Sequence, residues 1–384
     1  VGRGALDANT EANQNTAIGT GALTTATTTG SNTAIGHDAL CATTTGGQNN
    51  AFGDGTMAAN TTGCRNVAMG NGVMVQNTEG ECNVALGHIA LQCITTANHN
   101  TAIGASALRL NTATGNTAVG YLALCCNTSG TANVAVGANT LMRVATTTRN
   151  VAVGASVLAC NVGSCNTGLG HSALTANSSG DFNVAIGACS LDANTTADSN
   201  TAVGTLSLSA NTTGACNTAL GHSALTANTT GADNVAVGRQ ALQSNTTGAQ
   251  NIGIGTCALY TQTTAGGCNV SIGNYSLKLN TEGDNNIAVG YAALCKNTTA
   301  TGNVAVGASS MLDNTTGAQN TAIGNEALAN NTTAAGNVAI GSGAAYKNTE
   351  GADNVAMGVN SFKCNTTGSS NVAIGATALD ANTT

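Results

Sequence analysis

The most reactive side chains in this sequence are its 14 cysteines, spread over 384 residues. A catalytic cysteine needs a general base beside it, and no histidine recurs close to these residues. So many cysteines in a chain with only 7% charged residues are typical of an oxidising setting outside the cell, where thiols pair. We therefore expect disulfide bonds, an extracellular, cell-surface or virion-surface location, and no thiol enzyme.

The other residues capable of chemistry are too scattered to build a site. We expect four of the five histidines, His37, His88, His171 and His222, to face solvent from turns. The acidic residues do not recur at fixed intervals, as they do in calcium-binding β-rolls, and the common catalytic and phosphate-binding motifs do not occur. The net charge of -7 leaves no basic patch for nucleic acid, and no apolar run approaches the ~18 residues of a membrane span. The sequence therefore predicts no enzyme, no cofactor and no bound metal.

A recurring Asn-Thr-Thr motif is a candidate modification site, because Asn followed two residues later by Ser or Thr accepts N-linked glycans. A glycan coat would solubilise a chain so poor in charge. Asn-Thr-Thr-Gly is also favourable turn chemistry without any sugar, and both interpretations stay open. The acceptor sequence is intact in twelve of these motifs, at Asn60, Asn127, Asn177, Asn194, Asn211, Asn228, Asn245, Asn297, Asn314, Asn331, Asn365 and Asn382.

These residues recur because the whole chain is a tandem repeat. The consensus N-[TV]-A-[IV]-G-x-x-A-L-x-x-N-T-T-G-x-x starts at Asn15 and returns about every 17 residues as far as Asn371. There are 21 complete repeats and a partial one at each end; repeat positions are counted below from the first Asn of each repeat. A fixed period of this kind is typical of solenoids. We expect residues 1–384 to form a single continuous array.

The repeat predicts β-structure. Positions 1 to 4 alternate with period two and carry β-branched residues, as strands do. The invariant Gly at position 5 indicates a corner, and positions 8 to 10 predict a second short strand whose position 9 points inward. A helix is excluded because no 3.6-residue stripe exists, and disorder is disfavoured because positions 4 and 9 are apolar in every copy. The predicted fold class is an all-β parallel β-solenoid with one repeat per coil.

Position 3 bears on assembly, because it is only ever Ala, Gly or Ser. So small a side chain indicates that this strand face lies tight against another layer. The layer is either a neighbouring chain, which we favour, or the far wall of the same coil. Solenoids need polar caps, and neither end of the sequence shows one, so we expect the ends to be covered by further repeats or by other copies.

Stacked coils bring cysteines within bonding range. Parallel strands lie ~4.8 Å apart, and a disulfide needs Cα atoms ~4.4–6.8 Å apart. The first predicted pair spans adjacent coils, the second crosses one shortened loop, and the third lies within one coil. The predicted pairs are Cys64 with Cys82, Cys160 with Cys165, and Cys257 with Cys268.

The motifs NTAIG, NVAVG and NVAIG, followed by AL, resemble the head repeats of YadA-type trimeric autotransporter adhesins. They also resemble the NTAVG-AL-NTTG arrays of phage-tail-fibre-like surface proteins. The resemblance extends over the whole chain and implies a left-handed β-roll, three chains side by side, used as a stalk or adhesive head. The chain differs from YadA-type heads in two ways: its repeat period is longer, and it contains cysteines, which such heads generally lack.

Three functions follow as expectations. The first is a structural shaft of an extracellular fibre or filament, built by self-association as a trimer, another homo-oligomer or a filament. The second is an adhesin head that binds a glycan or a cell-surface ligand through its row of loops. The third is an ice-binding solenoid, because threonines repeat at the coil spacing.

Overall fold

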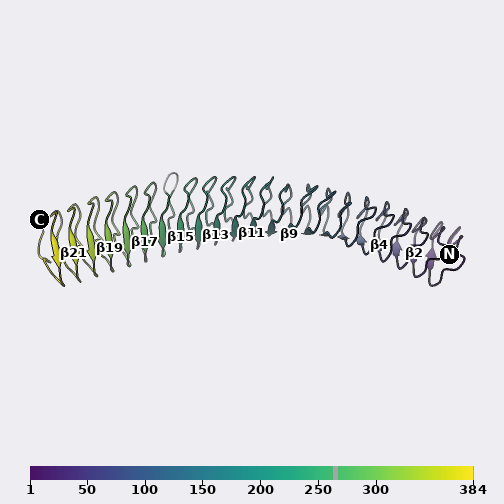
Figure 1. Ribbon diagram of the computed structural model, residues 1–384, viewed down its shortest axis with the longest axis horizontal. Helices are drawn as coiled ribbons and strands as arrows, with labels where there is room; N and C mark the ends of the chain where they lie inside the picture. The colour runs from purple at the N-terminus through teal and green to yellow at the C-terminus, as the bar shows by residue number, and fades with distance from the viewer. Residues whose placement is uncertain (263–266, 384) are drawn as a thin grey trace. The chain divides into compact units, whose positions relative to one another are not determined.

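The computed structural model describes residues 1–262 and 267–383 and divides the chain into two compact units, Val1–Asn183 and Val184–Thr384. Each unit is built from coils of about 17 residues that contain one short strand, and the strand bonds in parallel to its counterpart in the next coil (Figure 1). The predicted all-β parallel β-solenoid is confirmed.

All strands are three residues long. The first unit contains β1 (Thr16–Ile18), β2 (Thr33–Ile35), β3 (Asn50–Phe52), β4 (Val67–Met69), β5 (Val84–Leu86), β6 (Thr101–Ile103), β7 (Thr117–Val119), β8 (Val134–Val136), β9 (Val151–Val153) and β10 (Thr167–Leu169). The second contains β11 (Val184–Ile186), β12 (Thr201–Val203), β13 (Thr218–Leu220), β14 (Val235–Val237), β15 (Ile252–Ile254), β16 (Val270–Ile272), β17 (Ile287–Val289), β18 (Val304–Val306), β19 (Thr321–Ile323), β20 (Val338–Ile340), β21 (Val355–Met357) and β22 (Val372–Ile374).

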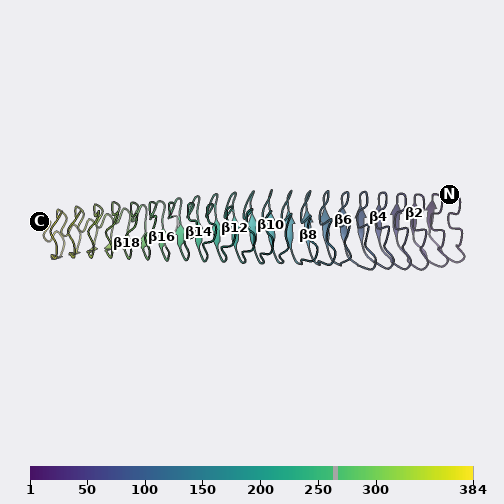
Figure 2. The ribbon, with the colours of Figure 1, turned by 90° about the horizontal axis from the view of Figure 1, so that it is seen from above.

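Consecutive strands pair in register, so each repeat position forms a column along its unit. Val184 of β11 lies opposite Thr201 of β12, and the Ala and the apolar residue that follow match in the same way. Figure 2 shows how the loops of successive coils repeat one another as closely as the strands do. Because like residues stack on like, each unit presents continuous columns of Thr and Val and of Ile and Val.

Position 3 faces the interior of its own coil. Ala34, Ala85 and Ala202 occupy this position and have no solvent exposure. At Gly253, in the same column, an added Cβ would lie 3.3 Å from Cδ1 of Leu242, which stands at position 9 of the preceding coil. The far wall of the solenoid therefore packs against position 3. The interpretation that this position faces a neighbouring chain is wrong, because the coil is too narrow to admit anything larger on its inner face.

Positions 6 to 11 form a series of tight turns, and the predicted second strand is absent from the described residues. The backbone is left-handed at positions 7 and 9, with φ of 59° at Leu206 and 50° at Leu208. An extended strand needs a negative φ at every residue, so this alternation excludes one. Leu208 nevertheless points inward, as predicted, and is fully buried.

The invariant Gly at position 5 is explained by close backbone approach between coils. Gly204 has a φ of +134°, and an added Cβ would lie 2.5 Å from the carbonyl oxygen of Gly221, its counterpart one coil later. A side chain at this corner would push the stacked coils apart.

Candidate functional site

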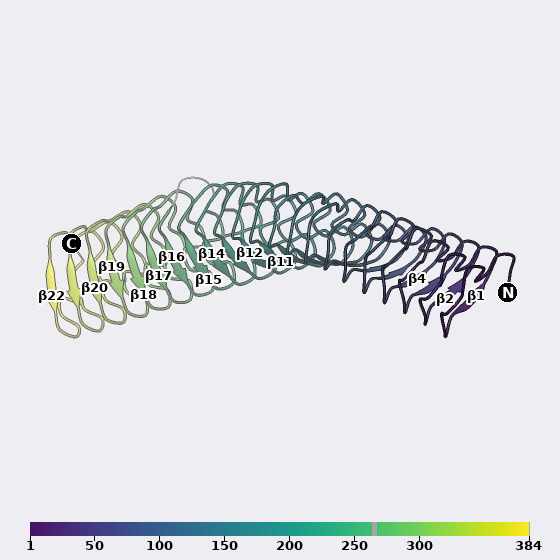
Figure 3. The ribbon, with the colours of Figure 1, turned by 45° about the vertical axis from the view of Figure 1, so that its right-hand side comes forward.

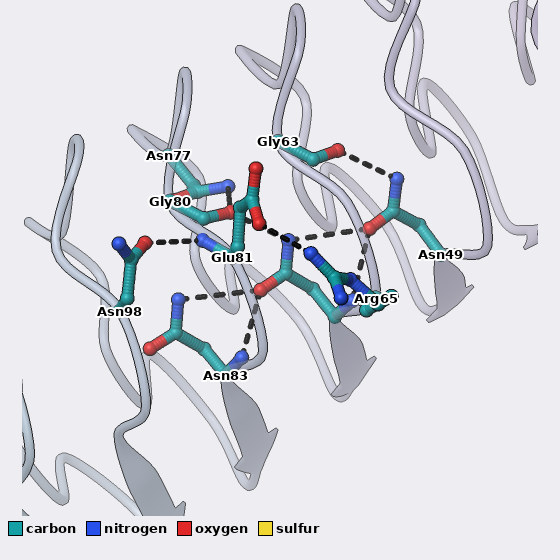
Figure 4. A network of polar contacts seen from close by, with 9 residues as sticks. Asn49, Gly63, Arg65, Asn77, Gly80, Glu81, Asn83 and Asn98 are labelled. Carbon is teal, nitrogen blue, oxygen red and sulfur yellow. Dashed lines mark hydrogen bonds and ion pairs between the residues drawn. The ribbon is translucent and has the colours of Figure 1, made fainter.

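A column of buried asparagines at position 1 holds successive coils together (Figure 4). The backbone N–H of Asn66 and its side-chain Nδ2 both donate to Oδ1 of Asn49, at 3.0 and 3.2 Å. Asn83 does the same to Oδ1 of Asn66, at 2.9 and 3.2 Å. Nδ2 of Asn49 also donates to the carbonyl of Gly63 at 2.9 Å. This column is therefore structural, because the Oδ1 atoms of Asn49 and Asn66 each accept hydrogen bonds from a buried backbone N–H and a buried side-chain amide of the next coil.

A second buried column runs through position 12. Nδ2 of Asn228 donates to Oδ1 of Asn211 at 2.8 Å and to the carbonyl of Gly231 at 2.9 Å. Oδ1 of Asn228 in turn accepts a hydrogen bond of 2.8 Å from Nδ2 of Asn245. The amide of Asn228 thus bonds to its counterparts in both adjacent coils, and its bond to Gly231 closes the Asn-Thr-Thr-Gly turn.

This second column contains the predicted glycosylation sites. A glycan is carried on Nδ2, which here is enclosed by the coil and engaged in hydrogen bonds. Asn382 is half-buried, and its Nδ2 lies 3.5 Å from Oδ1 of Asn365. The structure favours the turn interpretation and leaves no room for a glycan on the other eleven amides, all of them fully buried: Asn60, Asn127, Asn177, Asn194, Asn211, Asn228, Asn245, Asn297, Asn314, Asn331 and Asn365.

All 14 cysteines are free thiols in the structure. Cys64 and Cys82 lie in adjacent coils, as expected, and the N–H of Cys82 donates to the carbonyl of Cys64 at 3.1 Å. Cys160 and Cys165 bond in opposite directions along the stack, the first to the following coil and the second to the preceding one. The structure thus brings the backbones of the first pair together, and both disulfides stay predictions.

The third predicted pair contacts glutamines instead of each other. Sγ of Cys257 lies 3.6 Å from Oε1 of Gln240, and Sγ of Cys268 lies 3.4 Å from Oε1 of Gln250. Cys257 is buried and Cys268 is exposed, so the two thiols occupy different environments. A disulfide between them stays a prediction.

The charged and titratable side chains on the surface form isolated ion pairs. Nδ1 of His37 lies 3.2 Å from Oδ1 of Asp54, and Nη2 of Arg65 lies 2.7 Å from Oε2 of Glu81 (Figure 4). These side chains are all largely exposed, so the ion pairs contribute little to stability. Among the described residues no three His, Cys, Asp or Glu side chains converge as metal ligands, and no pocket is found.

The feature that remains is an outer apolar face, which we define as the side chains at positions 2 and 4 of the strands. Strand alternation places them outside whenever position 3 is inside. Ile103, Leu220 and Ile323 at position 4 are 40%, 47% and 40% exposed. No residue at either position is charged in any repeat. Figure 3 shows the strands of each unit aligned side by side, as such a face requires.

No protein-family model matches the chain, and no curated protein is detectably similar to it. The resemblance to YadA-type heads therefore rests on the repeat motifs alone. The structure supports the broader statement that the chain is a parallel β-solenoid of a kind compatible with repeat fibre proteins. In the part of the chain that the structure describes, no helix has the length and apolar character needed to cross a membrane.

Sequence reasoning missed two features of the surface. The first is the exposure of position 4, because a position that is apolar in every repeat normally marks a core. The second is the contact between Cys125 and Cys126, the only two consecutive cysteines in the sequence. That adjacency was a signal available from the sequence alone.

Proposed function

We propose that this chain is the structural shaft of an extracellular fibre or filament, and that copies of it associate laterally through the outer apolar face. The observation that carries this proposal is that regular, uncharged columns of half-exposed Thr, Val and Ile run along both units. Contiguous apolar surface of this kind marks interaction sites in soluble proteins.

The face of each unit is large enough to contribute substantially to association. Ten strands and twelve strands, spaced ~4.8 Å apart and about 10 Å long, present roughly 500 and 600 Å² of sheet. A stable protein interface buries about 800 Å² on each partner, so the face of either unit alone supplies more than half of that area.

The chemistry of the face suits contact with an identical copy. A symmetric interface brings the same surface patch of two copies together, so a patch with charges of one sign would repel itself. The outer apolar face has no charged residue at position 2 or position 4. Its β-branched side chains have few rotamers to lose, so ordering them at an interface costs little entropy. The cysteine content supports an extracellular location, as argued from the sequence.

The two other functions have no specific observation in their favour. An adhesin head needs a ligand site, and no pocket is found among the described residues. An ice-binding face usually carries paired threonine columns, whereas position 4 is never Thr here. A glycan array and a thermal hysteresis measurement would reveal either function directly.

Charge substitution on the outer apolar face tests the proposal. We expect the wild-type chain to associate in sedimentation velocity, and Ile103→Lys combined with Ile323→Lys to shift it towards monomer. One substitution lies in each unit, and each lysine would have to be desolvated at the interface.

The matched control combines Ser129→Lys with Thr316→Lys, which place the same charges on exposed loop residues. We expect this variant to associate like the wild type. A wild-type chain that stays monomeric at the highest attainable concentration would refute lateral association, as would equal association of both variants.

A further inference from the structure

Cys125 and Cys126 lie in the turn that follows β7, in the first unit. Their Sγ atoms are 3.4 Å apart. Among the described residues they are the only two thiols within hydrogen-bonding distance of each other. Cys125 is only 5% exposed, whereas Cys126 is half-buried and accessible from solvent. The pair therefore forms a compact dithiol with one open side.

The surroundings favour the protonated form of the inner thiol. Burial, followed by the hydrogen bond and the charge of Cys126, raises the pKa of Cys125 to about 12, although the nearby charge of Arg109 acts to lower it. Sγ of Cys125 donates to the carbonyl of Met142 at 3.4 Å. A ligand that needs two thiolates formed in advance is thus disfavoured, and one that takes up thiols by condensation is favoured.

Positive charge flanks the dithiol along the stack. Arg109 and Arg143 stand in the corresponding turns of the preceding and following coils. A guanidinium is a cationic group. This turn is therefore less favourable for a divalent cation than for a neutral ligand.

The sulfur separation selects the shape of the ligand. Two bonds of about 2.3 Å, as in metal–thiolate sites, reach sulfurs 3.4 Å apart at an S–X–S angle of roughly 95°. A tetrahedral zinc ion would open this angle to about 109° and would need two further ligands. A pyramidal trivalent centre that already carries one substituent uses the narrower angle and needs only two sulfurs.

We propose that Cys125 and Cys126 form a two-sulfur binding site for a trivalent thiophilic metalloid, with mono-substituted arsenicals as the ligand class. Binding is a condensation of R–As=O with two thiols. Two As–S bonds form, the bonds from arsenic to oxygen break, and the two thiol protons leave with that oxygen as one water molecule. Arsenic and sulfur keep their oxidation states, so no oxidant or reductant is needed.

Phenylarsine oxide is the probe for this site. The reduced full-length chain is treated with one equivalent, the remaining thiols are blocked with N-ethylmaleimide, and the protected cysteines are mapped by mass spectrometry. We expect Cys125 and Cys126 to be protected first, and a dithiol such as 2,3-dimercaptopropanol to reverse the protection while a monothiol does not.

Variants at matched positions decide whether chelation is responsible. Cys126→Ser should weaken binding at least tenfold and expose Cys125 to the blocking reagent. Cys295→Ser and Cys364→Ser remove single thiols from the same repeat positions, 10 and 11, and should leave the protection unchanged. Cys126→Ala repeats the test if the serine variant melts at a lower temperature. Protection of other cysteines first, or binding as tight as that of the wild type by Cys126→Ser and Cys126→Ala, would overturn the proposal.

Discussion

At the scale of single residues, buried asparagines take the part that large apolar side chains take in a globular core. A leucine in a core is stabilised by whatever surrounds it, whereas Asn228 needs an identical residue at each side along the stack. Because most of the buried Asn amides at positions 1 and 12 bond to their counterparts in adjacent coils, the hydrogen bonds of one coil depend on the next. This explains why Asn starts every repeat and recurs in most repeats at position 12, despite its low preference for regular structure.

Replacement of one such asparagine should also remove a hydrogen bond from the asparagine in the next coil. Asn228→Ala removes the two hydrogen bonds donated by Nδ2 and leaves Nδ2 of Asn245 without this acceptor in a buried site. We expect a loss of about 2–4 kcal/mol in the free energy of unfolding, from the cost of broken and unsatisfied hydrogen bonds. Urea denaturation followed by circular dichroism measures it.

Thr230→Ala, an exposed loop substitution two residues away, is the control and should change stability by less than about 0.5 kcal/mol. Similar losses in the two variants would show that the asparagine column is not a principal source of stability.

At the scale of the element, the coil is defined by a three-residue strand whose middle side chain is inside and whose outer two are not. The usual rule that apolar positions face the core fails at position 4, because the interior is filled by Ala at position 3 and Leu at position 9. Left-handed residues at positions 7 and 9 close the coil tightly enough that only small side chains fit opposite them.

Two leucines of one coil test which face is inside. Leu225→Ala at position 9 removes a fully buried side chain and should lower the free energy of unfolding by about 2–5 kcal/mol. Leu220→Ala at position 4 removes a half-exposed one and should cost about 1 kcal/mol or less. The same denaturation experiment compares them, and a larger loss for Leu220→Ala would reverse the assignment of the two faces.

At the scale of the whole molecule, charge is too sparse to control association. The chain has 10 basic and 17 acidic residues among 384, and none of them lies on the outer apolar face. The ion pairs present, such as that of Lys296 with Asp313, lie within single units at the surface. Apolar contact is the remaining driving force for lateral assembly.

The salt dependence of association follows from this distribution. Screening at about 1 M ionic strength shortens electrostatic interactions to roughly 3 Å but leaves apolar contacts intact. We expect the sedimentation profile to show equal or greater association in high salt than in low salt. Dissociation in high salt would indicate that charged loops, and not the outer apolar face, hold the copies together.

The repeat, its period, the parallel β-solenoid and the inward direction of the leucine column can all be predicted from the sequence. Each of these depends on local chemistry that recurs in every copy: β-branched alternation, a corner glycine and a turn motif. Which strand face lies inside depends on the folded coil, because strand alternation places Ala34 and Ile35 on opposite faces and does not specify which of them meets the far wall. The burial of the Asn60 amide and the contact between the thiols of Cys125 and Cys126 also depend on the folded coil. Both depend on the width of the coil and on its spacing from the adjacent coils, and the sequence of a single repeat specifies neither distance.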